Sequence, residues 1–261
     1  MTEVSSRQAI DISCDTGEDF GVYRIGIDDS IYRYLSSAHI ACGFHASDPD
    51  NMRAVARCLH RRKVRIGAHP GYPDLVGFGR RKMTMSPTAI TNLVLYQVGA
   101  CRALVEAEGA QLQHVKVHGA LYNAGEGDET IAQAIVEAVR LADDSLILVA
   151  TPGSAMYQLG REQGLRVASE YFFDRAYNSD GTLVSRSEPG AVLADPEEMV
   201  FRALSALEAG SIKSVDGKQV DVAPDTLCLH GDNPTSVAGL KMLRATLNDE
   251  GIAVKPLSEI L

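Results

Sequence analysis

Short apolar runs alternate with longer amphipathic segments along most of the chain. Seven of these runs have the length and composition of strands in a parallel sheet, and an eighth short run near the end is a further candidate. They cover residues 9–14, 38–42, 64–68, 113–118, 146–150, 165–169, 226–229 and 252–254.

Helix start and stop signals lie between the apolar runs. A capping side chain precedes a proline at residues 48–49, 86–87 and 195–196, which is typical of the first turn of a helix. Gly109 and Gly210 follow two of the apolar stripes and are expected to end those helices. Further helices are expected around residues 131–139 and from Pro234 to near Gly251.

Strands separated by helices indicate right-handed crossovers and a parallel sheet. Seven or eight such units favour one α/β domain over residues 1–261, a (β/α) barrel rather than an open sheet. An open doubly wound sheet usually carries a Gly-rich phosphate-binding turn after its first strand. Here that turn reads DTGED, which is acidic. Outside the repeating units, Asp216-Gly217 predicts a β-hairpin with a type I′ turn at 212–222.

Composition and charge narrow the classes of function. With 34 acidic and 25 basic side chains the net charge is -9, so we expect no nucleic-acid partner, because such binding needs clustered cations. We also expect no membrane segment, since the aliphatic runs are far shorter than ~20 residues. The first residues lack the apolar core of a secretory signal. Five cysteines without a CxxC motif indicate reduced thiols in a cytoplasmic protein.

Polar side chains gather where the expected strands end. Because the carboxyl ends of barrel strands open onto one face, such side chains should meet there. The residues in these positions are Asp15, His45, His69, His118, Asp174, Arg175 and His230. The remaining histidines are interpreted as structural: His39, His60 and His114.

Strand alternation places further polar groups inside the expected barrel. Asp11, Ser13 and Asp15 share one face of the first strand, and Lys116 shares a face with His118. Buried charges are costly unless they are paired or functional. The charged residues of this inner face therefore call for a functional explanation.

Two chemistries suit these residues. Histidines and aspartates can hold a divalent metal ion that activates water. Alternatively, Asp15 or a histidine acts as a general base while Lys116 or Arg175 stabilises an oxyanion. HExxH and GxSxG are both absent, which argues against a zincin and a serine nucleophile. Arg80 follows a Gly-rich loop on the same face and is a candidate for binding a carboxylate or a phosphate.

Seven ordered blocks of sequence resemble the LamB/YcsF family over nearly the whole chain. The blocks are IDISCDTGE, SSAHIACGFHASDPDNM, GAHPGYPDLVGFGR, LYQVGA, HVKVHGALYN, FFDRAYNSDGTLVSRSEPGA and TLCLHGD. The resemblance implies a divergent barrel related to the glycoside hydrolase/deacetylase group. It also implies ATP-dependent opening of the lactam 5-oxo-L-proline to L-glutamate, with ATP as co-substrate and two further subunits, B and C, as partners.

The resemblance also implies roles for the matching residues. The expected catalytic residues are Asp15, Glu18, Lys116, His118, Asp174 and Arg175. The expected substrate-binding residues are Arg80, Asn123 and Asp232, and the candidate ligands of a divalent metal are His45, His69 and His230. Ser13 stands where the family usually has asparagine, so any contact made by that asparagine would be weakened or reshaped.

The division of labour between the subunits follows from a missing motif. ATP could activate the lactam by phosphorylating its oxygen, yet the chain has no nucleotide-binding motif. We expect subunits B and C to form or hold the phosphorylated intermediate, while this barrel delivers water and protonates the ring nitrogen. Two alternatives stay open. One is a stand-alone metal-dependent hydrolase or deacetylase that acts on a carbohydrate or an amide, and the other is a non-catalytic substrate-binding subunit.

Overall fold

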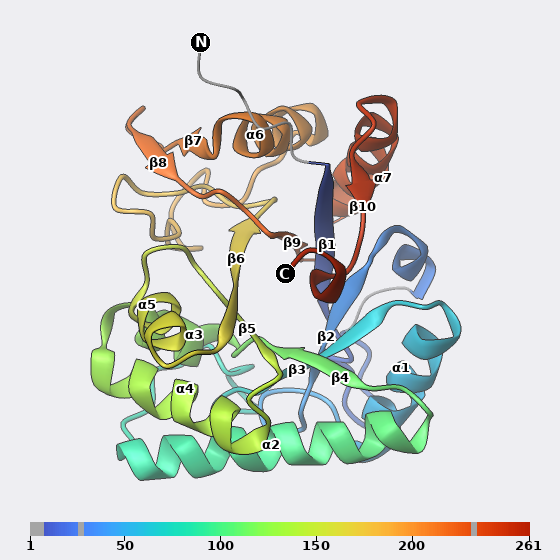
Figure 1. Ribbon diagram of the computed structural model, residues 1–261, viewed down its shortest axis with the longest axis vertical. Helices are drawn as coiled ribbons and strands as arrows, with labels where there is room; N and C mark the ends of the chain where they lie inside the picture. Colours follow the sequence, from blue (N-terminus) through green and yellow to red (C-terminus); the bar gives the residue numbers. More distant parts are fainter. Residues whose placement is uncertain (1–7, 26–28, 231–233) are drawn as a thin grey trace.

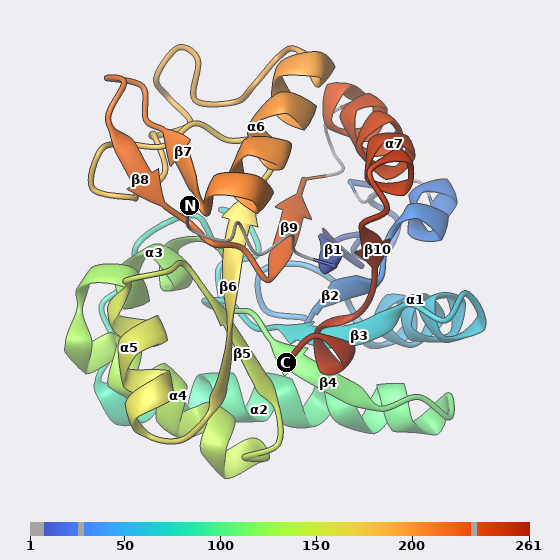
Figure 2. The ribbon, with the colours of Figure 1, turned by 45° about the horizontal axis from the view of Figure 1, so that its top comes forward.

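Seven parallel strands form a closed barrel in the computed structural model, which describes residues 8–25, 29–230 and 234–261. The strands follow the chain around the ring, and the last one pairs with both its predecessor and β1. In Figure 2 they lie in the middle of the molecule, with the helices outside them. They are β1 (Ala9–Thr16), β2 (Ser37–Ala41), β3 (Arg65–His69), β4 (Leu112–Val115), β5 (Ile147–Ala150), β6 (Arg166–Phe172) and β9 (Thr226–Leu229).

The predicted (β/α) barrel is therefore confirmed, with seven strands in the ring. The expected eighth strand exists as β10 (Ala253–Val254), which pairs with the first residues of β1 and stays outside the ring. Its two residues extend the sheet without entering the closed barrel.

The helices cover the outside of the barrel (Figure 1). The predicted caps are confirmed: the Asp48 carboxylate accepts from the backbone of Asp50 and Asn51, and Gly210 ends its helix with a left-handed backbone. The helices are α1 (Pro49–Arg61), α2 (Pro87–Ala107), α3 (Gly119–Gly127), α4 (Glu129–Ala142), α5 (Ala155–Glu162), α6 (Pro196–Ala209) and α7 (Pro234–Asp249), with 3-10 turns η1 (Asp29–Tyr34) and η2 (Leu257–Glu259).

Two of these helices, α3 and α5, have no counterpart among the predicted elements. The α3 sequence GALYNAGEG contains three glycines, a residue that weakens helices. The α5 helix has only eight residues, too few for an apolar stripe to repeat. Packing on the barrel, rather than local preference, stabilises both.

Helix α2 is long and apolar enough, by composition alone, to cross a membrane. The expectation of no membrane segment rested on short aliphatic runs and stays a prediction, because the length and composition of α2 alone do not place it in a membrane. In the structure the helix lies beside α4 and buries one face, which includes Ile90, Val94, Val98 and Cys101, in the main core (Figure 1). This is the packing of a helix that covers a barrel.

The predicted hairpin near 212–222 is confirmed as β7 (Ser211–Lys213) and β8 (Gln219–Asp221), beside α6. Its type I′ turn is wrong. Five residues, 214–218, connect the strands, and Gly217 has a positive φ of 80° whereas Asp216 does not. A type I′ turn needs positive φ at both central residues. The Ser214 hydroxyl instead accepts from the Lys218 amide and donates to Asp216, which closes the wider turn.

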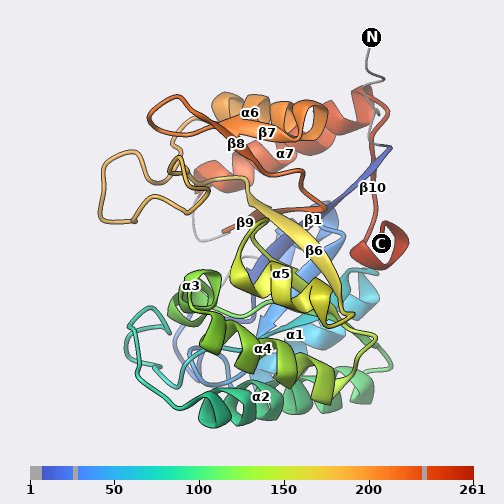
Figure 3. The same cartoon turned by 60° about the vertical axis from the view of Figure 1, so that its left-hand side comes forward.

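The two ends of the barrel differ in what covers them. In Figure 3 the long loops after β3 and β6 extend to one side, while β10 and the C-terminus lie on the other. At the second end, Leu257 of η2 packs inside the barrel against Ile147, Val149 and Ala168. The first end, where the strands finish, stays open and forms the mouth.

Candidate active site

A cavity of about 610 Å³ opens at the mouth of the barrel, within the usual range for small-molecule sites. It collects side chains from the ends of most strands. The predicted residues that line it are Asp15, Glu18, His69, Arg80, Lys116, His118, Asn123, Arg175 and His230. His45 and Asp174 are buried just behind the lining, in contact with His118 and His230 respectively. Asp232 lies outside the described residues.

Asp15 is the centre of the polar network at the cavity floor. Its Oδ1 accepts from Lys116 Nζ at 3.0 Å and from His39 Nδ1 at 2.9 Å, and its Oδ2 lies 3.3 Å from His69 Nε2. Burial alone would raise the pKa of Asp15. The charges of His69 and Lys116 and the hydrogen bond from His39 hold that pKa well below its usual value. Asp15 is therefore an ionised carboxylate in a nearly dry site.

Lys116 compensates two buried carboxylates. Its Nζ lies 3.0 Å from Asp15 Oδ1 and 2.8 Å from Glu170 Oε1, and 4.9 Å above the ring of Phe172. Burial would lower the pKa of this amine, but Asp15 and Glu170 raise it well above its usual value. One ammonium between two carboxylates leaves the group with a net negative charge, and opposite charges in so dry a setting are strongly coupled.

The structure adds two residues to the predicted set. His39, interpreted as structural, donates to Asp15 from the neighbouring strand, because Asp15 and His39 are register partners. Glu170 lies inside the barrel near the end of β6, beyond the expected end of that strand. Strand alternation, applied to β2 and to a longer β6, would have found both.

Below Asp15 the barrel interior holds a second polar network, in which hydroxyl groups surround one carboxyl group. Asp11 accepts hydrogen bonds from the hydroxyls of Ser36, Ser37 and Thr226, and burial raises its pKa to about 6. Ser13 bonds to Thr226 at 2.8 Å. Ser13 does not line the cavity. The serine that replaces the family's asparagine therefore changes contacts below the cavity floor, not in the cavity lining.

Three imidazoles pack against one another beside Asp15. His69 Nδ1 donates to the Lys116 carbonyl at 2.7 Å, and His118 Nε2 donates to the Phe78 carbonyl at 2.8 Å. The His45 ring stacks on the His118 ring at 3.8 Å, and both of its nitrogens are buried without a hydrogen-bond partner in the described part of the chain. Burial lowers the pKa of His118 to about 3 and lowers that of His45 well below its usual value.

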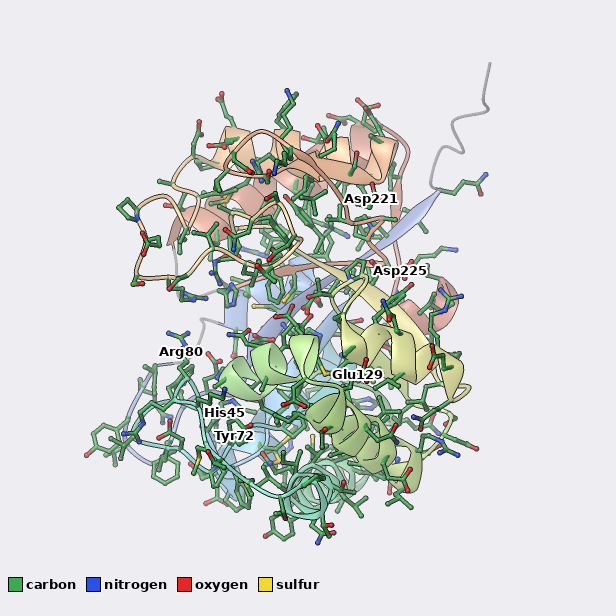
Figure 4. The ribbon with its side chains drawn as sticks, turned by 90° about the vertical axis from the view of Figure 1, so that its left-hand side faces the viewer. His45, Tyr72, Arg80, Glu129, Asp221 and Asp225 are labelled. Carbon is green, nitrogen blue, oxygen red and sulfur yellow. The ribbon has the colours of Figure 1, made fainter. Side chains whose placement is uncertain are left out.

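Glycines in the loop after β3 create room for these rings. A Cβ atom at Gly71 would lie 2.6 Å from His45 Nδ1. One at Gly79 would lie 2.7 Å from the His45 Cβ and 2.8 Å from His118 Cδ2, and Gly79 also has a φ of 63°. The Gly-rich loop is therefore a cradle for the histidine cluster, and it brings Arg80 to the mouth. In Figure 4, Arg80 lies toward the open side, with His45 and Tyr72 close together below it.

The arrangement of nitrogen and oxygen atoms tests whether a metal ion fits. His69 Nδ1 and His118 Nε2 each donate to a backbone carbonyl, which can only accept, so the other nitrogen of each neutral ring is an acceptor. These two acceptors, His69 Nε2 and His118 Nδ1, lie 3.0 Å apart, and His69 Nε2 also lies 3.3 Å from Asp15 Oδ2. Three acceptors at one point need a positive charge, either a proton on His69 or a metal ion. Atoms of His45, His69 and His118 also lie within 4.8 Å of one another. A borderline divalent ion fits such ligands, and backbone partners on the other ring nitrogens are typical of metal sites.

His230 is not in this cluster, although it was a predicted ligand. Its Nδ1 lies 3.0 Å from Asp174 Oδ1, and its amide donates to Asp174 Oδ2. Ser236 also donates to that carboxylate. Burial opposes ionisation of Asp174, but His230 and these hydrogen bonds lower its pKa. The Asp174–His230 pair thus fixes one imidazole at the cavity wall, stacked on Phe172.

Arginines surround the mouth. Arg175 is buried and donates to the carbonyls of Val184 and Ala191, so it also holds the loop after β6. Burial, together with nearby Arg186 and Arg80, lowers its pKa to about 10. Arg80 stacks on Phe78 with its guanidinium carbon 5.0 Å from the ring centre. Like charges held this close favour an anionic ligand.

Comparisons with known proteins agree with this geometry. The model of the LamB/YcsF family matches residues 10–261. The 5-oxoprolinase A subunit of Pyrococcus furiosus is 48% identical over 97% of this chain and 99% of the relative. That of Heliobacterium modesticaldum is 50% identical over 94% and 97%. A lactam utilization protein from Thermus thermophilus superposes with a TM-score of 0.89 at 42% identity, covering 95% of this chain and 99% of that one. The chain belongs to the LamB/YcsF family.

Proposed function

We propose that this chain is the ring-opening subunit of a 5-oxoprolinase, which hydrolyses the amide bond of 5-oxo-L-proline to give L-glutamate. The names of its relatives support this substrate. The observation that carries the proposal is the ionised, buried Asp15, bonded to Lys116 and His39 and facing His69, on the floor of a small-molecule cavity. A carboxylate of this kind can accept a proton from water that attacks a carbonyl carbon.

The remaining steps follow from the other side chains of the cavity. Lys116 Nζ is the group that stabilises the oxyanion, because it lies on the cavity floor 3.0 Å from Asp15 Oδ1, next to the point where water would attack. His230, oriented by Asp174, protonates the ring nitrogen as the carbon–nitrogen bond breaks. Arg80 and Asn123 bind the substrate carboxylate at the mouth.

His45, His69 and His118 would hold a divalent metal ion if the enzyme uses one, with Asp15 beside them. Such an ion would act as a Lewis acid and lower the pKa of water. The sequence expectation placed His230 in this role, whereas the geometry favours His118.

ATP enters this proposal through the partner subunits. A five-membered lactam is a stable amide, and phosphorylation of its oxygen would make the carbon more electrophilic. Because the chain has no nucleotide-binding motif, we propose that subunits B and C, in the cytoplasm, form that intermediate from lactam already bound at this mouth. This barrel then hydrolyses it: water adds to the ring carbon, and inorganic phosphate and the ring nitrogen leave that carbon, which gives glutamate.

The test is ATP consumption and glutamate formation from 5-oxo-L-proline by the chain alone and with subunits B and C. We expect neither ATP consumption nor glutamate formation from the lone chain, and both from the complex. Full activity of the lone chain would refute the division of labour.

A second candidate is a stand-alone metal-dependent amide hydrolase or deacetylase. The facing acceptor atoms of His69, His118 and Asp15 favour it. It predicts a stoichiometric transition metal in the purified chain and ATP-independent hydrolysis of amides that chelation abolishes. Hydrolysis that requires ATP would exclude it.

A further inference from the structure

A carboxyl group that belongs to none of the expected site residues lines the cavity wall. Glu126, near the end of α3, accepts a hydrogen bond from Thr151 Oγ1 at 2.8 Å through its Oε1. The same hydroxyl lies 2.9 Å from Tyr122 Oη. Thr151 follows β5, so this wall forms where α3 meets the end of that strand.

Asp15 is surrounded by positive groups that favour its charge, whereas the charged groups that act on Glu126 are negative. The charged groups that act on it are the carboxylates of Glu170 and Asp180, and within the described residues it has no ion pair. Arg175 and Arg186 line the same cavity without pairing with it. Burial first, and then these carboxylates, raise the pKa of Glu126 to about 7. An uncharged carboxyl group is thus readily available at the cavity wall.

We propose that Glu126, in its neutral form, recognises the amide edge of a lactam substrate. This inference rests on the proposed function and names the substrate feature that the site selects. A five-membered ring locks its amide in the cis form, so the N–H and C=O groups lie side by side on one edge. A neutral carboxyl group offers a donor and an acceptor side by side as well, and the two edges form paired hydrogen bonds.

The contact with Thr151 assigns the two oxygens of Glu126. Oε1 already accepts from the hydroxyl, so it is the carbonyl oxygen, and a second lone pair can accept from the lactam N–H. Oε2 then carries the proton and donates to the lactam oxygen. An ionised Glu126 has no donor and would repel that oxygen. Ordinary peptide amides are trans and present the two groups on opposite edges, so they cannot make this pair.

The experiment measures binding of 2-pyrrolidinone to the full chain by calorimetry at pH 6 and pH 8.5. Wild type should bind at least about tenfold more weakly at pH 8.5, where Glu126 is ionised. Glu126→Gln should bind equally at both pH values, because its amide keeps one donor and one acceptor. Glu126→Leu should bind weakly at both. N-methyl-2-pyrrolidinone, which lacks the N–H, should bind weakly to every variant.

Two controls separate this inference from the proposed function. Glu129→Gln, an exposed change at the start of α4 (Figure 4), should behave as wild type. Infrared difference spectra of wild type minus Glu126→Gln should show the C=O stretch of a protonated carboxylic acid at pH 6. Wild-type binding that is equal at both pH values, or the absence of that band, would overturn the role of Glu126. Glutamate formation by the complex reports separately on the proposed function.

Discussion

The two sides of the barrel interior occupy equivalent positions and differ in chemistry. Strands β1 to β4 and their ends point Asp11, Asp15, His39 and Lys116 inward, all of them buried. Lower on strands β5 and β6, Ile147, Val149 and Ala168 point inward and Leu257 covers them, whereas Glu170, higher on β6, belongs to the polar group around Lys116. The apolar side stabilises the fold by burial. The polar side costs desolvation energy and is tolerated because each charge has a partner, so we infer that it is kept for chemistry.

The largest effect is expected from Asp15→Asn. It removes the proton acceptor while keeping the shape of the side chain, so glutamate formation by the complex should fall about a hundredfold to ten-thousandfold. Asp221→Asn, at the exposed end of the hairpin, is the matched control (Figure 4). A folded Asp15→Asn variant with the full rate would support a chain that only binds substrate.

Substitutions on the two sides should both destabilise the protein, for different reasons. Lys116→Met leaves Asp15 and Glu170 as uncompensated buried carboxylates, which should cost about 3–5 kcal/mol. Ile147→Ala leaves a cavity and should cost about 2–5 kcal/mol. Urea unfolding measures both costs.

Catalysis should separate these two variants. Ile147→Ala should keep kcat/KM within about twofold of wild type wherever it is folded, because the residue packs against Leu257 at the end of the barrel away from the cavity. Lys116→Met should lose activity even under conditions in which it is folded. Equal kinetic losses in the two variants would contradict the division of the interior into a stabilising and a chemical side.

His39 should act through Asp15. His39→Leu removes the hydrogen bond to Oδ1 and should lower kcat/KM about 10- to 100-fold, a magnitude usual for residues that orient a functional group. His39→Asn should recover most of the rate, because its amide can donate in place of Nδ1. If the Asn and Leu variants are equally impaired, the positioning role is wrong.

The smallest effect concerns the pH dependence of stability. Burial raises the pKa of Asp11 to about 6 in the folded protein. Its contribution to stability is therefore complete below its unfolded pKa of about 4 and declines as the pH rises through 6. Between pH 4 and pH 7 the stability of wild type relative to Asp11→Asn should fall by on the order of 2 kcal/mol. Urea unfolding over this range checks it, and a flat difference would argue for a permanently ionised Asp11.

The fold and the cavity floor could be predicted from sequence because their signals are local. Strand alternation correctly placed Asp11, Asp15 and Lys116 inside the barrel, and strand ends brought most of the expected residues to one mouth. Those patterns depend only on the period of a strand and on the parallel direction of the sheet.

The missed residues depend on contacts between distant segments. His39 could be assigned to Asp15 only through the register of β1 and β2. Glu126 lies on α3, whose glycine-rich sequence gives no helical signal. His230 was predicted to join His45 and His69, but it pairs instead with Asp174, a residue 56 positions away, and His118 takes its place in the histidine cluster. None of these pairings has a signature in local sequence.

The most direct test of the central claim is a crystal structure of the chain with 5-oxo-L-proline. We expect the lactam at the mouth of the barrel, with its carbonyl carbon facing Asp15 and Lys116 and its carboxylate toward Arg80. A lactam bound at the opposite end, or at the mouth with its carboxylate buried at Asp15, would contradict the account.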